Sequence, residues 1–415
     1  MNSSSVNRFV STLNVVLLFA GYEFFSAIVS IFIGNTESPI INIGYRGVSA
    51  IVCLFVIFNN FRIKHRPRNQ TIVLLLYLFW SLLILRFIDD MYLSSEISIL
   101  PSIRTRTWLY MVILTIMPMI SVSLSIEQID FNKAFKWITI LIIVAVIIAF
   151  FQNFNYEPDE LDEISRVSTE GLGSIGSGHM ALTAIILSAC HLINSGKKHA
   201  IITIVFFGII VLSTIVMLRT GSRGPLLALF GVGIVFAISK TKRPILWLIV
   251  LAVFALFYNQ IIDLLLNAIR PVAPNLYSRF TFKAENGGQF ESRMFNYLSA
   301  IDAFRENPII GKQFAIYLPG REMIYAHNLF LDSIMQLGII GGTMILVIVV
   351  GTMRLVYRLI RQGRCIMWIC LIFVQKFFYL MLSSSFYYTP IFSIIIVLLF
   401  KWVSMEKRRT PTFNT

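Results

Sequence analysis

Long apolar runs alternate with short polar segments along nearly the whole chain. A helix needs roughly 20 residues to span the hydrocarbon core of a bilayer. Because lipid offers no water to unpaired backbone groups, runs of that length cross it only as helices. We predict about twelve such helices, near residues 10–33, 44–61, 70–88, 107–124, 134–151, 179–194, 199–218, 222–239, 243–265, 329–353, 365–383 and 388–404. The pattern predicts an all-α polytopic integral membrane protein.

The amino-acid composition also predicts a membrane protein. Of the 415 residues, 57% are hydrophobic and only 13% are charged, which is too apolar for a water-soluble fold of this length. The first apolar run follows one basic residue, Arg8, and lacks a small-residue cleavage site. We therefore expect it to stay in the protein as a helix and not to be removed as a signal peptide.

Lysines and arginines cluster on one side of the predicted helices. If the helices alternate in direction, every cluster falls on that side: Arg62, Lys64, Arg66 and Arg68; Lys197 and Lys198; Lys240, Lys242 and Arg243; Arg354, Arg358, Arg361 and Arg364; Lys407, Arg408 and Arg409. The positive-inside rule makes this side the cytoplasm, with both termini there. The net charge of +14 is then explained by topology and contact with membrane lipid, and not by binding nucleic acid.

The loops on the opposite side are longer and mixed in sign. They comprise residues 88–106, the acidic stretch 156–170 and the long segment 266–328. Within the long segment, apolar residues recur at helical spacing, so we predict an amphipathic helix over 292–306 that lies on the membrane surface.

These boundaries predict three parts. Residues 1–265 hold transmembrane helices one to nine, and residues 266–328 form a large periplasmic loop that carries short amphipathic helices. Residues 329–415 hold the last three transmembrane helices and a cytoplasmic tail.

No motif for a metal or a nucleotide is present in the sequence. The four cysteines, Cys53, Cys190, Cys365 and Cys370, all fall within predicted helices, so a disulfide framework or a thiolate metal site is not expected. A Walker loop, a dinucleotide glycine fingerprint and an HExxH pattern are all missing. We expect neither a cofactor nor a metal.

Two arginines stand where the seventh predicted helix ends and the eighth begins. In "LRTGSRGPLLALF", Arg219 and Arg223 flank a glycine-containing turn, and Pro225 suits the first turn of a helix. Backbone N–H groups of that helix beside two guanidiniums would make an anion-binding corner. The alternative is that both arginines only anchor helix ends at the interface.

The long loop adds more cationic side chains and a histidine. Arg293 opens the predicted amphipathic helix, and Arg279 and Arg321 are additional candidates, although a solvated loop charge is the simpler explanation for those two. His327 stands just before the tenth predicted helix. It either fills a turn before the cap Asn328 or takes a proton from an attacking hydroxyl, since an imidazole titrates near neutral pH.

Three segments together resemble the superfamily of O-antigen polymerases and O-antigen ligases: "TGSRGPLLAL", "ESRMFNYLSAIDAFRENPIIGKQF" and "YAHNLFLDSIMQLGIIGG". They lie within residues 219–345, whereas the first five helices match only in hydropathy and number. Members are bacterial inner-membrane glycosyltransferases that act on undecaprenyl-pyrophosphate-linked sugars at the periplasmic face. The resemblance therefore implies a GT-C-like fold in that membrane and a periplasmic active site.

The resemblance also implies roles for four residues. Arg223, with Arg219 as its neighbour, and Arg293 would bind the pyrophosphate, while His327 would act as the base. Tyr297 stands four residues after Arg293, where the family often has a bulky aromatic residue. The partners would be an undecaprenyl-pyrophosphate-linked oligosaccharide and membrane lipid, with a chain-length regulator protein as an open candidate.

The implied reaction transfers a glycan from its polyprenyl pyrophosphate to a sugar hydroxyl. Direct attack inverts the anomeric configuration and needs one base, whereas retention needs a paired carboxylate nucleophile. Asp332 falls inside a predicted helix and Glu291 is a lone candidate, so we favour a metal-independent, inverting reaction.

Two alternatives stay open. We favour a polymerase over an O-antigen ligase, because the acidic stretch 157–163 would repel the phosphorylated lipid A core that a ligase must accept. From another class, a polysaccharide transporter or flippase also fits twelve helices. Lys376 and Glu23 would then be its ionisable residues near the middle of the bilayer.

Overall fold

The computed structural model describes residues 3–33, 39–61, 70–93, 100–152, 154–159, 162–169, 172–195, 200–241, 267, 270, 277, 288–317 and 323–409. Within these ranges, nine helices are long and apolar enough to cross a membrane, and Met367–Leu382 is a shorter apolar helix. The helical, polytopic fold expected from the sequence is confirmed. Every predicted stretch coincides with a described helix except 243–265, which lies outside the described residues.

The first half of the chain forms five spans, three of which contain π-helical turns. The elements are α1 (Ser3–Val16), η1 (Leu17–Gly21) and α2 (Tyr22–Ile33); α3 (Pro39–Phe61); α4 (Thr71–Ile88) and η2 (Asp89–Leu93); α5 (Pro101–Trp108), η3 (Leu109–Ile116), α6 (Met117–Ser125) and η4 (Ile126–Gln128); and α7 (Phe131–Phe151). The wider turn at η1 is held from a neighbouring helix, because the Tyr45 hydroxyl donates to the carbonyl oxygen of Leu17 at 2.6 Å.

The second half begins with a hairpin and continues as helices. The elements are β1 (Phe154–Asp159) and β2 (Asp162–Thr169), α8 (Ser174–Ser195), α9 (Ala200–Arg219), α10 (Arg223–Lys240), α14 (Gly288–Glu306), α15 (Leu329–Arg361), α16 (Met367–Leu382), η6 (Phe386–Tyr388) and α17 (Pro390–Arg409). The two strands are antiparallel, with Phe154 opposite Thr169. Hydropathy did not predict this hairpin, because its strands are too short and polar to give an apolar run.

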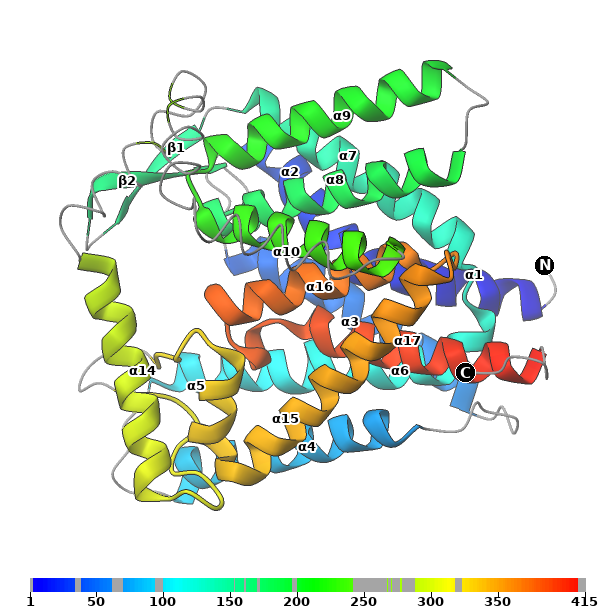
Figure 1. The fold of residues 1–415 in the computed structure, drawn as a ribbon. Helices are drawn as coiled ribbons and strands as arrows, with labels where there is room; N and C mark the ends of the chain where they lie inside the picture. Colours follow the sequence, from blue (N-terminus) through cyan, green and yellow to red (C-terminus); the bar gives the residue numbers. More distant parts are fainter. Residues whose placement is uncertain are drawn as a thin grey trace.

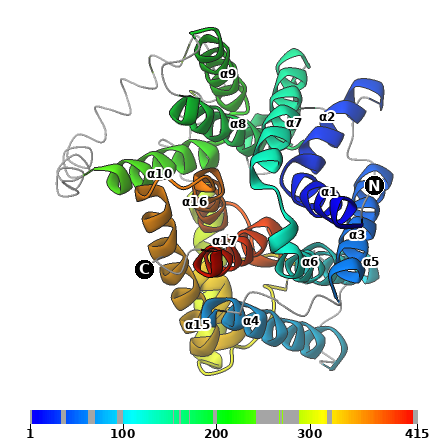
Figure 2. The same ribbon diagram turned by 90° about the vertical axis from the view of Figure 1, so that its right-hand side faces the viewer.

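Helices α16 and α17 lie at the centre of a ring formed by the other helices (Figure 2). The first nine residues of α16, from Met367 to Gln375, are all buried. A helix that is apolar on every side must be covered by protein or by lipid, and these nine residues are covered by protein. In α17 the Ser393 hydroxyl accepts a hydrogen bond from the Trp80 indole of α4 at 3.1 Å, which ties the centre to the ring.

The two ends of the molecule differ in structure (Figure 1). Both chain termini lie at one end, and α14 and the hairpin lie at the other. The start of α8, the turn between α9 and α10 and the start of α15 also belong to the end that carries α14. The predicted loop residues therefore gather at one end of the bundle, opposite the termini.

Helix α14 confirms the predicted helix over 292–306 but begins earlier, at Gly288. Its small residues Ala300 and Ala303 are buried against the protein, whereas Phe295 and Leu298 are each 50% exposed. The apolar stripe that the sequence showed is thus turned away from the bundle, as expected for a helix on a membrane surface.

Helix α15 is broken near its start, at Leu337 and Gly338. Gly338 has a φ of +61°, and a Cβ atom there would lie 2.4 Å from the carbonyl carbon and oxygen of Ile309. Gly311 has a φ of +75° and meets the backbone of Gln336 equally closely. Glycine is required at both positions because the loop after α14 packs directly on the backbone of α15.

Candidate functional site

His327 has a strained backbone that its neighbours hold in place. With a φ of +57°, it is the one non-glycine residue in the described parts of the chain that has a positive φ. After it, the Asn328 side chain caps α15 by accepting from the backbone N–H groups of Phe330 and Leu331, at 3.0 and 3.2 Å. Before it, the N–H of Ala326 donates to Asp332 at 2.8 Å. Strain of this kind persists only where surrounding contacts enforce it, and it concentrates at functional sites.

Helix α14 packs on the segment that carries His327. Ala300 and Ala303 form a small core with Ile316, Ala326 and Met335, and Tyr297 packs against it. Ile316 and Ile324 exchange two backbone hydrogen bonds, of 2.8 and 3.0 Å, which close the loop between them.

Arg293 lies on α14 one turn before Tyr297. Its side chain is exposed, whereas Tyr297 is half-buried. The aromatic residue expected four positions after the loop arginine thus contacts the cluster that includes Ala326, the neighbour of His327.

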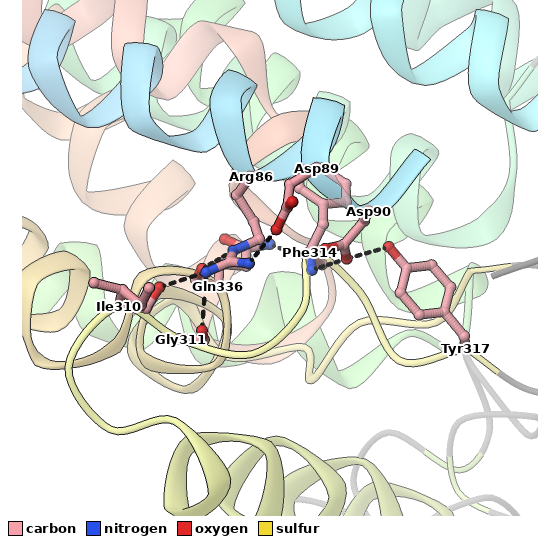
Figure 3. A network of polar contacts seen from close by, with 8 residues as sticks. All are labelled: Arg86, Asp89, Asp90, Ile310, Gly311, Phe314, Tyr317 and Gln336. Carbon is pink, nitrogen blue, oxygen red and sulfur yellow. Dashed lines mark hydrogen bonds and ion pairs between the residues drawn. The ribbon is translucent and has the colours of Figure 1, made fainter. Parts of the chain in front are cut away.

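A partly buried arginine holds the loop that follows α14 (Figure 3). The guanidinium of Arg86 donates to the carbonyl oxygens of Ile310, Gly311 and Gln336, at 2.8, 2.9 and 3.1 Å. It also forms an ion pair of 2.8 Å with Asp89. A planar guanidinium suits this task because its five N–H donors have a fixed geometry.

The neighbouring carboxylate holds the same loop further along (Figure 3). Asp90 accepts from the backbone N–H of Phe314 at 2.5 Å and from the Tyr317 hydroxyl at 2.7 Å. Burial, together with the Asp90 charge, raises the pKa of Tyr317, which therefore remains a donor. The side-chain amide of Gln336 donates to the carbonyl oxygen of Phe314 at 2.8 Å. Residues of α4 and η2 thus fix the loop that leads to His327.

The turn between α9 and α10 contains the other predicted arginines. Arg219 ends α9 and its guanidinium lies over the Phe150 ring, 5.0 Å from the centroid. Arg223 begins α10, and the turn between them passes through Gly221, with a φ of +65°. Pro225 lies in the first turn of α10, as the sequence suggested, although the helix begins two residues before it, at Arg223.

Three helices meet at this turn. A Cβ atom on Gly178 of α8 would lie 2.6 Å from the ring of Pro225. A Cβ atom on Gly224 would lie 3.1 Å from the Ser383 hydroxyl at the end of α16 and 3.9 Å from Nε2 of His179. The start of α8, the start of α10 and the end of α16 are therefore in close contact.

A cavity of about 270 Å³ lies beside the start of α8 and the last turns of α16. Its polar lining includes Glu23, Arg46, Tyr110, His179, Lys376 and Tyr388. Such a volume is near the lower end for a small-molecule site, roughly 300–1,000 Å³.

Aromatic rings connect the cavity with His327. The Tyr325 and His327 rings are 4.3 Å apart between centroids, and Tyr325 is 5.9 Å from Tyr388. Tyr388 in turn contacts Tyr110 at 4.9 Å. Burial raises the pKa of Tyr325, so this residue stays uncharged beside the histidine.

The cavity is also lined by ionisable side chains that belong to apolar helices. Glu23 and Lys376 lie within electrostatic range of each other, and Arg46 donates to the Tyr110 hydroxyl at 2.5 Å with its guanidinium 4.6 Å from that ring. The sequence reasoning identified Glu23 and Lys376 but missed Arg46 and His179. The available signal was an ionisable residue at the start of an apolar stretch, which is costly unless it has a partner or a function.

Arg279 and Arg321 lie outside the described residues. Among the residues that the structure describes, no group of three or more His, Cys, Asp or Glu side chains could hold a metal ion. Asp332 lies inside α15, as the sequence indicated. The roles of Arg219, Arg223, Arg293 and His327 remain predictions.

The fold and the site define an integral membrane protein of many helices, whose strained histidine and arginine turn lie at the end opposite the termini. Residues 207–346 match the family described as O-antigen ligase. This match confirms the resemblance to the O-antigen polymerase and ligase superfamily, and it supports polymerase or ligase activity by a membrane glycosyltransferase-like enzyme that uses lipid-linked oligosaccharides. No curated protein and no solved structure matches the chain.

Proposed function

We propose that this chain is a polymerase of O-antigen or another surface polysaccharide. It transfers a glycan from undecaprenyl pyrophosphate to a sugar hydroxyl of a second lipid-linked repeat unit, at the periplasmic face of the bacterial inner membrane. The main support is His327, whose strained backbone is held by Asn328 and by the bond from Ala326 to Asp332. The matched family range contains this histidine and the arginine turn.

His327 acts as the base in this proposal. The acceptor hydroxyl oxygen forms a bond to the anomeric carbon, and its proton passes to the imidazole. The bond from that carbon to the pyrophosphate oxygen breaks, and its electron pair leaves with the pyrophosphate. General-base help of this type contributes about 10² to 10⁴ in rate. Attack opposite the leaving group inverts the anomeric configuration, and no metal takes part.

Arginines bind the leaving pyrophosphate in the same proposal. Arg219 and Arg223 contribute from the turn before α10, where the positive end of the helix dipole adds to their charge. Arg293 contributes from α14, and Arg279 and Arg321 are additional candidates. Charge-assisted, bidentate hydrogen bonds from arginine stabilise a phosphate as negative charge develops on it.

The choice of polymerase over ligase rests on the hairpin. The acidic stretch 157–163 lies largely within β1 and β2, at the same end of the molecule as α14 (Figure 1). Acidic residues near the acceptor path would repel the phosphorylated lipid A core. A strain that lacks the gene separates the two activities on a gel. One repeat left on the core means a lost polymerase, whereas a bare core with polymer retained on its carrier means a lost ligase.

A reconstituted reaction tests the chemistry directly. The purified protein in nanodiscs is given undecaprenyl-pyrophosphate-linked repeat units and no other enzyme. We expect lipid-linked chains of several repeats, and no such products with His327→Ala. In nanodiscs there is no second compartment, so a transporter or flippase would yield no new glycosidic bond. Repeat units recovered unchanged with the active wild-type protein would contradict the proposed function.

A further inference from the structure

His179 on α8 is a buried histidine that the proposed reaction has not yet used. It is 4% exposed, and its Nε2 atom has no hydrogen-bond partner among the described residues. Buried polar atoms in proteins are nearly always paired, since an unmade hydrogen bond costs free energy. A ligand that completes this bond explains the arrangement.

Gln375 favours one tautomer of the His179 ring. Its amide nitrogen donates to the carbonyl oxygen of His179 at 2.7 Å, and a carbonyl can only accept, so the orientation of the amide is fixed. The same nitrogen lies 3.5 Å from Nδ1 of His179. It also donates to the Thr183 hydroxyl at 3.1 Å, and an unprotonated Nδ1 suits its place beside this N–H group. In that tautomer of the neutral ring, Nε2 is the protonated nitrogen and a donor.

This donor lies at the start of α10. A Cβ atom built on Gly224, the second residue of that helix, would lie 3.9 Å from Nε2 and 3.1 Å from the Ser383 hydroxyl. Ser222, at the N-cap, makes no side-chain capping hydrogen bond. The positive end of an 18-residue helix and a buried N–H donor thus share one small space that has no side chain at position 224.

The charges around His179 also suit an anion. Lys376 lies within electrostatic range of His179, and also of Glu23 across the cavity. Glu23 offsets part of the lysine charge. Arg223 is the first residue of α10, and Nε2 of His179 lies near the N-terminus of that helix. A phosphate oxygen accepts hydrogen bonds from neutral and cationic donors alike.

We propose that His179 is a phosphate-binding residue, which donates from Nε2 to an oxygen of the polyprenyl pyrophosphate at the N-terminus of α10. The proposal deepens the proposed function and rests on it for the identity of the ligand. Helix α8 would then bind the leaving pyrophosphate through His179, in addition to α10, which binds it through Arg223.

Binding to the purified protein in phosphatidylcholine nanodiscs tests this role, with undecaprenyl pyrophosphate as the probe. His179→Phe keeps the ring and removes the donor, so we expect affinity to fall about ten- to a hundredfold. His179→Gln places an amide N–H near the position of Nε2 and should recover most of the affinity. The matched control is His191→Phe on the same helix, where the ring is stacked between Phe135 and Phe206 at 4.3 and 4.5 Å and affinity should not change.

Competition experiments identify the source of the phosphate. Inorganic pyrophosphate should compete with the probe, and nanodiscs rich in phosphatidylglycerol should not. Competition by the phospholipid instead would overturn the assignment to the polyprenyl carrier. Thermal unfolding of each variant shows whether lost affinity reflects lost folding, and a folded His179→Phe protein that binds as well as wild type would overturn the proposal.

The outcomes separate this inference from the function. If His179→Phe loses binding while the wild-type protein forms no glycosidic bond, the phosphate site stands and the polymerase does not. If the wild-type protein polymerises and His179→Phe binds the probe normally, the polymerase stands and His179 has no role in binding phosphate.

Discussion

The backbone N–H of Ala326 donates to the carboxylate of Asp332 across one turn, at 2.8 Å, and His327 lies between them. Asp332 is 1% exposed, so this carboxylate has no access to bulk water and binds the loop from inside the fold. The contact explains how a non-glycine residue keeps a left-handed backbone. The position of the proposed base thus depends on a residue that need not touch the substrate.

Asp332→Ala should abolish transfer without preventing membrane insertion. The change leaves the buried N–H of Ala326 without its acceptor, which costs about 1–3 kcal/mol, and it frees His327 to leave its strained conformation. The measurement is chain extension by the reconstituted protein, with thermal unfolding alongside. Asp332→Asn keeps an acceptor oxygen and should retain much of the activity; equal loss in both variants would argue for a direct role of the carboxylate.

Arg86→Ala should loosen the loop that follows α14. It removes three hydrogen bonds to backbone carbonyl oxygens, two of which are partly buried. The change should lower stability by about 2–3 kcal/mol, with lower activity because the loop leads to His327. Thermal unfolding in detergent measures the loss. Asp89→Asn is the control, because this partner is 55% exposed and exposed ion pairs contribute little. Unchanged unfolding of Arg86→Ala would show that the network in Figure 3 is not needed for stability.

Gly338→Ala should destabilise the protein by well over about 1 kcal/mol. The new Cβ atom would lie 2.4 Å from the backbone of Ile309, at a φ of +61°. Gly233 of α10 has nothing within 4 Å of its Cβ position, so Gly233→Ala should be neutral or stabilising by up to about 1 kcal/mol. The unfolding temperatures of the two variants test this prediction. If Gly233→Ala were less stable than Gly338→Ala, the break in α15 would not be a fixed feature.

Tyr325→Ala should reduce transfer, and Tyr325→Phe should not. The ring separates His327 from Tyr388 of the cavity, and phenylalanine keeps both contacts. Burial raises the pKa of Tyr325, so its hydroxyl stays neutral at physiological pH and its loss changes no charge. Rates of chain extension for the two variants test this. A large loss in Tyr325→Phe would assign the role to the hydroxyl and not to the ring.

Labelling of cysteines tests the proposed orientation. Cys365 is exposed and the other three native cysteines are buried. Because it follows α15 at the end near the termini, a membrane-impermeant maleimide should label it only after cells are opened. Arg305→Cys on α14 places a thiol at the opposite end, where the native side chain is 74% exposed, and should be labelled in spheroplasts. Labelling in the opposite order would invert the topology.

Local patterns found the elements that lie near His327 but not their contacts. Asn328 was predicted to cap α15 and does so, because a cap involves only neighbouring residues. The contact of Arg86 with Gln336 joins positions 250 residues apart, and no single local pattern could reveal it. His179 and Arg46 were missed for the same reason, since only the packed bundle shows that they line a cavity.

The sequence by itself determined that this is a helical membrane protein and where nearly all of its described helices lie. Each apolar run must form a helix in lipid, because its backbone N–H and C=O groups then pair within the run itself. This requirement is local and involves no other segment of the chain. Only the tertiary structure decided the left-handed backbone of His327, the glycine contact between α15 and its loop, and the buried donor of His179 at the start of α10. These features arise from atoms that distant segments bring together, so packing sets them and hydropathy does not.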